Sequence, residues 1–404
     1  MLKKSYLVHN TSKEIISQGN SSTPRRFRST RLKRLAGITA SLALFAAALP
    51  TFAATTQWWN PTPSITYGST SLDVTRFGAV GNGAMDDTAA FQAAINALPS
   101  SGGTIIVPDG TYMIDTTKGI NLRSNMRLAM HSNAYLKSIP NSADFASVVK
   151  AWNVSNVEIV GGHILGERTQ HAPSANDISE VKVHYGISIQ EANTVYVHNI
   201  QVADCYGDGV LVGTTFGWRA FTLPWGITLN HVTVTNSARQ GLSITAADQV
   251  YVLNSSFTGS HGMIPNAGID LEPARLGPLK HVRLENNVLS NNQGNGLEIH
   301  DNLSGVVVTG NTAENNQGNG VFARGPNNLT ITNNMLSQNY QFGVYIDDGT
   351  NSVQLHDNTI NYNGDAWFIA HGKSIFTPGT APRDIFISTN AIGVTQYNNT
   401  ITKQ

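Results

Sequence analysis

The stretch Val282-Arg-Leu-Glu-Asn-Asn-Val-Leu-Ser-Asn-Asn-Gln-Gly-Asn-Gly-Leu-Glu-Ile-His300 contains two short runs separated by a turn rich in Asn and Gly. In residues 282–286 and 296–300, apolar side chains alternate with polar ones. Alternation with a period of two is typical of a β-strand that buries one face. The stretch therefore predicts a strand, a polar turn and a second strand.

The same unit recurs along the chain from about residue 150. The first strands of successive units end 32, 23, 32, 24, 23, 24 and 32 residues apart, so the base period is 23–24 residues and three units are enlarged. About 23 residues at ~3.3 Å each make three short strands and their turns, which is one coil of a parallel β-helix. Leucine-rich and helical solenoids are the alternatives, but the β-branched bias and the scarcity of helix formers exclude most of them. The first strands end at Asn199, His231, Asn254, Asn286, Gly310, Asn333, Asp357 and Thr389.

Asparagine recurs at matching turns of these units. Its side chain suits left-handed corners, and stacked amides can form ladders between coils. The positions are Asn286, Asn287, Asn311, Asn333, Asn334 and Asn358.

An amphipathic helix is expected ahead of the repeats. Asp86 and Asp87 suit the N-cap of a helix, and Phe91, Ile95 and Leu98 then recur on one face. A strand and tight turn follow in residues 102–112.

Two segments of this region carry a family resemblance. They are Phe77-Gly-Ala-Val-Gly-Asn-Gly-Ala-Met-Asp-Asp-Thr-Ala-Ala-Phe-Gln-Ala-Ala-Ile95 and Gly102-Gly-Thr-Ile-Ile-Val-Pro-Asp-Gly-Thr-Tyr112. They resemble the N-terminal cap of the pectate lyase/rhamnogalacturonase-like superfamily, which phage tailspikes and mannuronan C5-epimerases also carry. The resemblance implies an all-β solenoid, a right-handed single-stranded parallel β-helix that acts on polysaccharide. It does not determine the reaction.

The N-terminus predicts export. A basic stretch in residues 25–34, an apolar run in residues 35–49 and the small residues around Ala53 are typical of a secretory signal peptide spanning residues 1–53. A membrane anchor is the alternative, although the run is short for one. We expect an irregular leader in residues 54–71 and a β-helix domain in residues 72–404 with its cap in residues 72–115. A secreted or periplasmic location follows.

The charge distribution bears on partners. The first 53 residues hold nine Lys and Arg and one acid, so the remainder carries 17 bases, 25 acids and a net charge of −8. Such an acidic protein is a poor nucleic-acid binder. We expect a polysaccharide partner, no membrane contact after signal cleavage, and a monomer or homotrimer. The single Cys205 excludes an internal disulfide.

Polar side chains gather on the second strand of several units. In the segment of residues 266–275, Asp270 and Glu272 alternate with apolar residues and are expected side by side on the surface. Aligning the second strands on their first Gly predicts two outward columns. One column is Leu211, Ser243, Asp270, Glu298, Phe322 and Tyr345, and the other is Gly213, Thr245, Glu272, His300, Arg324 and Asp347.

Enlarged coils surround these columns. The coil of Asp270 is lengthened in residues 261–265 and 273–280, the preceding coil gains residues 214–225, and a third insertion occupies residues 372–383. We expect a groove with Asp270, Glu272, Glu298, His300 and Arg324 as catalytic residues. Substrate binding is assigned to Tyr345, Asp347, Trp218, Trp225 and His261, because aromatic rings stack on sugars. A solvated face with ion pairs Glu272–His300 and Arg324–Asp347 is the simpler alternative.

Three chemistries compete for this site. Glycoside hydrolysis uses two carboxyls, one with a raised pKa, and is slightly favoured because carboxylates dominate the columns. Lyase or C5-epimerase chemistry needs a base, a cation and an acid, for which Tyr345, His300 and Arg324 could serve. Asp208-Gly209 partly matches the polygalacturonase branch, but its paired Asp and Gly-His-Gly motifs are absent.

Similarity to the epimerases at the site is confined to one position. Residues 268–273 resemble their Gly-Phe-Asp-Pro-His-Glu segment, but only Asp270 carries over. No cofactor and no dedicated metal site are expected, although calcium could bind Asp270, Glu272 and Glu298. A non-catalytic carbohydrate-binding β-helix is the remaining alternative.

Overall fold

The computed structural model describes residues 57–171, 183–215, 222–273, 277–364 and 384–402. The expected signal peptide, Trp218 and the insertion in residues 372–383 lie outside these ranges. Among the described residues, no helix is long and apolar enough to cross a membrane.

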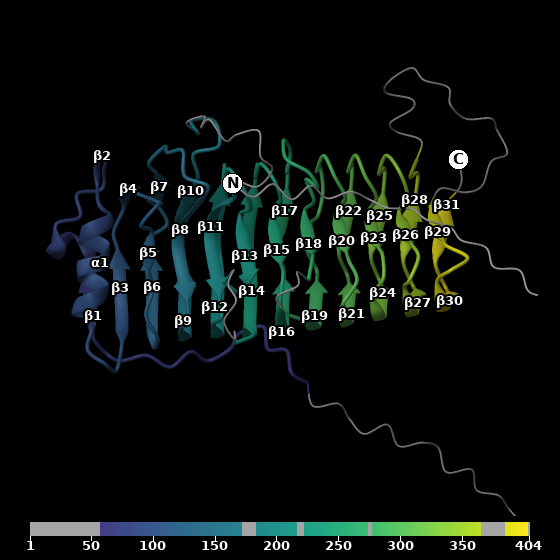
Figure 1. The fold of residues 1–404 in the computed structure, drawn as a ribbon, viewed down its shortest axis with the longest axis horizontal. Helices are drawn as coiled ribbons and strands as arrows, with labels where there is room; N and C mark the ends of the chain where they lie inside the picture. The colour runs from purple at the N-terminus through teal and green to yellow at the C-terminus, as the bar shows by residue number, and fades with distance from the viewer. Residues whose placement is uncertain (1–56, 172–182, 216–221, 274–276, 365–383, 403–404) are drawn as a thin grey trace, which may run out of the picture. The chain divides into compact units, whose positions relative to one another are not determined.

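The described strands succeed one another from β1 and α1 to β30 and β31, and their coils stack through parallel ladders (Figure 1). The ten-stranded sheet, called the site sheet below, consists of β5 (Ile120–Asn121), β8 (Phe145–Trp152), β11 (Val183–Gln190), β13 (Val210–Gly213), β15 (Leu242–Ile244), β18 (Ile269–Leu271), β20 (Leu297–Ile299), β23 (Val321–Ala323), β26 (Val344–Ile346) and β29 (Ile385–Ile387).

A second ladder runs parallel along the stack. Its strands are β1 (Ser71–Asp73), β3 (Gly103–Val107), β6 (Met126–Met130), β9 (Ser155–Val160), β12 (Asn193–Ala203), β14 (Trp225–Thr235), β16 (Ala247–Leu253), β19 (Leu279–Glu285), β21 (Leu303–Thr309), β24 (Asn327–Thr332), β27 (Asn351–His356) and β30 (Ile392–Tyr397).

The third ladder shares the long strands β12 and β14 with the second. Its other strands are β2 (Asn82–Asp86), β4 (Gly110–Ile114), β7 (Ala134–Ser138), β10 (His163–Leu165) and β17 (Ser256–Thr258), followed beyond Val288 by β22 (Thr312–Glu314), β25 (Met335–Ser337), β28 (Thr359–Asn361) and β31 (Thr400–Thr402).

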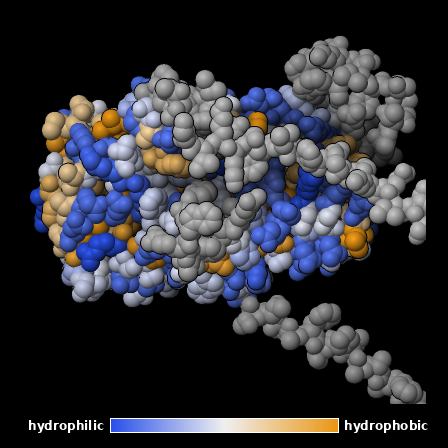
Figure 2. Space-filling model, viewed as in Figure 1, coloured by the Kyte–Doolittle hydropathy of each residue, from blue (hydrophilic) through white to orange (hydrophobic). Residues whose placement is uncertain are grey.

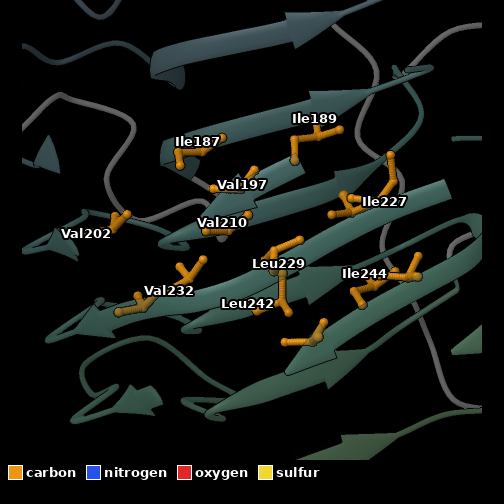
Figure 3. Close-up of a cluster of buried hydrophobic side chains, with 14 of the residues drawn as sticks. Ile187, Ile189, Val197, Val202, Val210, Ile227, Leu229, Val232, Leu242 and Ile244 are labelled. Carbon is orange, nitrogen blue, oxygen red and sulfur yellow. The ribbon is translucent and has the colours of Figure 1, made fainter. Parts of the chain in front are cut away.

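The core lies inside the coils, as the alternating pattern predicts. Side chains from facing strands, such as Ile187, Val197, Ile227 and Leu242, point into one continuous apolar interior (Figure 3). Each fully buried branched side chain contributes about 1.5–3 kcal/mol. Outward positions are free to carry polar groups, and the face visible in Figure 2 is largely hydrophilic. The expected parallel β-helix is confirmed.

The cap closes the first coil. The helix α1 (Thr88–Ala97) follows the short 3₁₀ turn η1 (Val74–Phe77) and buries Phe91 and Ile95, as expected. Asp87 occupies the N-cap position, as expected, but its carboxylate makes no cap hydrogen bond and accepts from the Val80 amide at 2.7 Å instead. The side-chain cap comes from Asp86, whose Oδ1 accepts a hydrogen bond from the Thr88 amide at 2.9 Å.

Buried asparagines form two ladders that link the later coils. Each side-chain oxygen accepts from the preceding ladder residue, while each amide donates onward. Asn316 illustrates this: it donates to Leu289 O at 2.8 Å and Asn339 Oδ1 at 2.9 Å, and it accepts from Asn292 Nδ2 at 3.0 Å. The expected left-handed corners are separate residues, such as Asn286 with φ 54°. The ladders are Asn287–Asn311–Asn334–Asn358–Asn399 and Asn292–Asn316–Asn339–Asn363–Asp384.

We predict that Asn316→Ala lowers the free energy of unfolding by about 2–4 kcal/mol, because it leaves the Asn292 amide and the Leu289 carbonyl buried without this partner. Chemical denaturation followed by circular dichroism measures the effect. The neighbouring exposed Gln317→Ala is the control and should change stability little. Equal stability of the two variants would contradict a structural role for the ladder.

Candidate functional site

The outward face of the site sheet carries a continuous column of side chains in register from coil to coil. The sequence alignment predicts the six members from Leu211 to Tyr345, and the structure pairs them directly. The column is Asn121, Lys150, Ser188, Leu211, Ser243, Asp270, Glu298, Phe322, Tyr345 and Phe386. Neighbouring side chains of this column therefore lie about 4.8 Å apart, and the acids Asp270 and Glu298 are placed next to each other.

Asp270 is buried, so its expected place on the surface is wrong. It points away from the apolar core, yet it is 0% exposed because neighbouring side chains cover it. Gln240 Nε2 donates a hydrogen bond to its Oδ2. His300 Nε2 lies 3.2 Å from its Oδ1. The carboxyl group therefore forms the floor of the site.

Arg239 organises the other half of the site. Its Nη2 contacts both oxygens of Glu272, at 2.7 and 2.8 Å, and its Nη1 contacts Asp208 Oδ2 at 3.0 Å. Ser243 donates to the same Asp208 oxygen at 2.9 Å. Burial alone would lower the pKa of Arg239, but Asp208 and Glu272 raise it overall. Because the Arg239 guanidinium is hydrogen-bonded to both carboxylates, it fixes the orientations of Asp208 and Glu272.

His300 bridges two carboxyl groups. Its Nε2 lies 3.2 Å from Asp270 Oδ1 and 3.2 Å from Glu298 Oε1, and Asn295 donates to the second Glu298 oxygen at 2.9 Å. Hydrogen bonding to Asp270 and Glu298 raises the pKa of His300 to about 10, although burial opposes this. The expected Glu272–His300 ion pair is therefore wrong: Glu272 pairs with Arg239, one coil earlier.

Two buried carboxyls have raised proton affinity. Burial raises the pKa of Asp270 to about 7; His300 opposes this shift, and Glu272 and Glu298 add to it. Burial also raises the pKa of Asp208 to about 6, against the pull of Arg239 and with a contribution from Glu272. Proton-holding acids beside carboxylates in polar surroundings are a common pattern in acid–base catalysis.

Hollows lie on both sides of this network along the stack. On the side of β8 and β11, a cavity of about 370 Å³ is lined by Phe145, Lys150, Trp152, Tyr185 and other residues of those strands. On the side of β23 and β26, a polar hollow of about 460 Å³ is lined by His300, Asp301, Arg324, Gly325, Asp348 and Gly349. The acidic network thus has an aromatic hollow on one side and a charged hollow on the other.

Two segments of the chain match known protein families. Residues 225–403 match the family described as right handed beta helix region, and residues 71–149 match rhamnogalacturonase A/epimerase, pectate lyase-like. These two partial matches confirm the resemblance to the pectate lyase-like superfamily noted from the sequence, one over the repeats and one over the cap.

The curated relatives match only part of this chain and part of their own length. The uncharacterized protein YclG of Bacillus subtilis is 29% identical over 266 residues, which are 59% of this chain and 45% of that protein. The chain spans less than half the length of the first curated relatives it matches.

Two solved structures support the fold. The Azotobacter vinelandii mannuronan C-5 epimerase AlgE6 A-module has a TM-score of 0.61 at 21% identity, covering 81% of this chain and 90% of that one. PfbA, a surface adhesin of Streptococcus pneumoniae, has a TM-score of 0.57 at 14% identity, covering 82% and 91%. Identities this low bear on the fold alone.

The other residues expected at the site lie in different surroundings. Arg324 and Asp347 form the expected pair, with 3.8 Å between Nε and Oδ2. Tyr345 stacks on Phe386, with ring centroids 4.5 Å apart. His261 contacts Arg168 Nη1 through Nδ1 at 3.2 Å. Trp225 begins β14 in the second ladder and lines neither hollow.

Sequence reasoning missed Arg239 and Gln240, and it used Asp208 only as a motif fragment. The repeat could have revealed Asp208 and Gln240, because each directly precedes the Gly (Gly209 and Gly241) on which the second strands are aligned. It missed the aromatic hollow as well, because Phe145 and Trp152 lie in β8, ahead of the aligned units.

Calcium binding at this site would require free carboxylate oxygens from Asp270, Glu272 and Glu298. Asp270, Glu298 and His300 present ligand atoms within 4.8 Å of one another. Calcium takes six to eight oxygen ligands. Glu272 gives both oxygens to Arg239, and His300 contributes nitrogen. The arrangement does not fit the expected calcium set, and the mechanism below uses no metal.

We predict that Asp270→Asn makes the fall of stability between about pH 4.5 and pH 6 shallower, leaving the part that the raised pKa of Asp208 contributes. In the wild type the folded state binds an extra proton at Asp270, so stability falls as pH rises from the unfolded value of 3.8 toward 7. Removing the carboxyl should remove on the order of 2 kcal/mol of that fall.

Urea denaturation at several pH values measures this slope, and His300 is largely protonated in both states over the chosen range. Asp301→Asn, which replaces an exposed aspartate, is the control. A wild-type slope retained by Asp270→Asn would contradict a raised pKa for Asp270.

Proposed function

We propose that this chain is a polysaccharide-cleaving enzyme whose active site is the outward face of β15, β18 and β20, with hydrolysis as its reaction. One observation carries the proposal: the buried acid Asp270 contacts His300, whose side chain is 36% exposed, and Glu272, two residues after Asp270, has a carboxylate that is 25% exposed. Groups that hold a proton and groups that accept one are thereby brought together. The two flanking hollows support an extended chain as the substrate.

In hydrolysis, His300 beside Asp270 would supply the general acid, and Glu272 beside Arg239 would supply the general base. His300 donates a proton from its other ring nitrogen, Nδ1, to the glycosidic oxygen as the bond to the anomeric carbon breaks. The ring keeps its Nε2 hydrogen between Asp270 and Glu298 and becomes a neutral imidazole, which regains a proton at Nδ1 from solvent before the next turnover. Glu272, oriented by Arg239, accepts a proton from the attacking water. Glu298 holds His300 in position.

A second reaction is favoured by the charged hollow. His300 and Arg324 both line it, and two cations suit the carboxylate of a uronate sugar. Neutralising that carboxylate makes the neighbouring carbon–hydrogen bond more acidic, as β-elimination or C5 epimerisation requires. Similarity to the AlgE6 A-module is compatible with this alternative.

A non-catalytic role is the third candidate. The likeness to the PfbA adhesin is compatible with a binding protein built on the same fold. In that case the network around Arg239 is a structural feature, and its carboxyls are dispensable for binding. Export of the chain, expected from residues 1–53, is a further part of the proposal.

We predict that Glu272→Gln and His300→Gln each reduce turnover at least about 100-fold, because each removes one proton-transfer group. A panel of neutral and uronate polysaccharides is assayed for new reducing ends and for unsaturated-uronate absorbance. Reducing ends alone indicate hydrolysis, and both signals indicate elimination. Proton exchange at C5 without cleavage indicates epimerisation.

The matched control is Glu285→Gln, which breaks the Arg283–Glu285 ion pair of 2.7 Å on the second ladder. It should retain full turnover. Full turnover in both site variants would overturn the site, and binding without any reaction across the panel would favour the adhesin-like role.

We predict that Trp152→Ala raises KM about tenfold, equivalent to about 1.4 kcal/mol, with little change in kcat. Trp152 is 37% exposed in the aromatic hollow and lies four coils from Asp270, so it can stack on a sugar ring without touching the reacting bond. Steady-state kinetics on the substrate identified by the panel measure both constants. An equal loss in kcat would contradict a purely binding role.

A further inference from the structure

A second cluster of ionisable side chains lies outside the proposed active site. Glu167 follows β10, His171 lies in the same connection, and His184 is the second residue of β11. Their side chains are 1%, 4% and 3% exposed. Each offers one ligand atom, and these atoms lie within 4.8 Å of one another. Two imidazoles and a carboxylate are thus enclosed together at the first residues of β11.

The hydrogen bonds of His184 define its protonation. Nε2 lies 2.6 Å from the backbone oxygen of Ala143, which only accepts, so Nε2 carries a hydrogen. Nδ1 faces Glu167 Oε1, which also accepts when ionised. In a neutral ring Nδ1 would then be a bare lone pair directed at a carboxylate oxygen. A cation is needed between them, either a second proton or a metal ion.

His198 contacts a carboxylate without any lone pair facing it. It also contacts a carboxylate, with Nε2 2.9 Å from Glu158 Oε1. Its Nδ1, however, faces the donor Asn199 Nδ2 at 2.9 Å. One neutral tautomer satisfies both contacts. His198 therefore requires no extra cation, and it is a matched control for His184.

A second imidazole favours the metal over the proton. His171 directs its Nδ1 at the same Glu167 oxygen, 3.4 Å away, and its ring is stacked on Tyr206 with centroids 3.6 Å apart. A proton links one nitrogen to one oxygen, whereas a metal ion accepts both nitrogens and the oxygen together. Two His and one carboxylate form a ligand set that Zn²⁺ takes in proteins.

The surroundings match those of a metal ligand. A ligating His commonly donates its other ring hydrogen to a backbone carbonyl, as His184 does to Ala143. The nitrogen content excludes a preference for calcium or magnesium, which select oxygen ligands.

We propose that Glu167, His171 and His184 bind one divalent transition-metal ion, best matched by Zn²⁺. The ion ties the connection after β10 to the start of β11. The next residue, Tyr185, lines the aromatic hollow, so the metal fixes one wall of that cavity. This proposal is independent of the catalytic assignment.

The test uses the purified full-length chain and Zn²⁺ alone as the probe. After metal removal and reconstitution, we expect about one Zn²⁺ per chain by elemental analysis, and a higher melting temperature with Zn²⁺ than without. Substitution with Co²⁺ should give the visible absorption of a low-coordinate site with nitrogen ligands.

The variants His171→Gln, His184→Gln and Glu167→Gln should each weaken Zn²⁺ binding at least about tenfold and abolish the thermal shift. His198→Gln should bind as the wild type does. His171 lies outside the strands, so its variant decides the matter if the His184 variant does not fold. Absence of Zn²⁺ and Co²⁺ binding in the wild type, or unchanged binding by His171→Gln, would overturn the proposal and leave a doubly protonated His184 paired with Glu167.

Discussion

The in-register stacking of each coil on the next is the constraint on which this structure depends. Parallel pairing places equivalent residues about 4.8 Å apart, so each column of the sequence repeat becomes a row of touching side chains. The inward columns are branched and apolar, and they fuse into one core. The outward columns inherit the same spacing, which is why acids and bases from different coils come into contact.

Stacking also creates a problem at the corners, where backbone groups are buried without ladder partners. The two asparagine ladders solve it, since each amide satisfies both a backbone carbonyl and the next ladder side chain. Asn311, for example, donates to Leu284 O at 2.9 Å and to Asn334 Oδ1 at 3.0 Å. The asparagine ladders begin at Asn287 and Asn292, just before the strand of Glu298, and run to the last described coils, whereas the Glu167 cluster lies in the earlier coils.

The proposed active site contains charges that are costly to bury. Arg239 offsets Asp208 and Glu272, and His300 offsets Asp270 and Glu298. Four carboxyls face two cations, so the site favours retaining a proton, and burial assigns it to Asp270. A protein under selection for stability alone would replace such a network with apolar residues. Its retention beside an apolar core is a reason to assign it a function.

The period of the coil, the inward and outward alternation, the cap and the neighbours of Asp270 along its column are all predictable from the sequence. These follow from backbone geometry and the repeat, which act locally. Only the tertiary structure decided that Asp270 is covered, that Glu272 turns to Arg239 rather than His300, and that Glu167 meets two histidines. Side-chain direction at a coil edge depends on which charges the adjacent coils present. Arg239 lies in a turn, 33 residues from Glu272, where strand alternation makes no prediction.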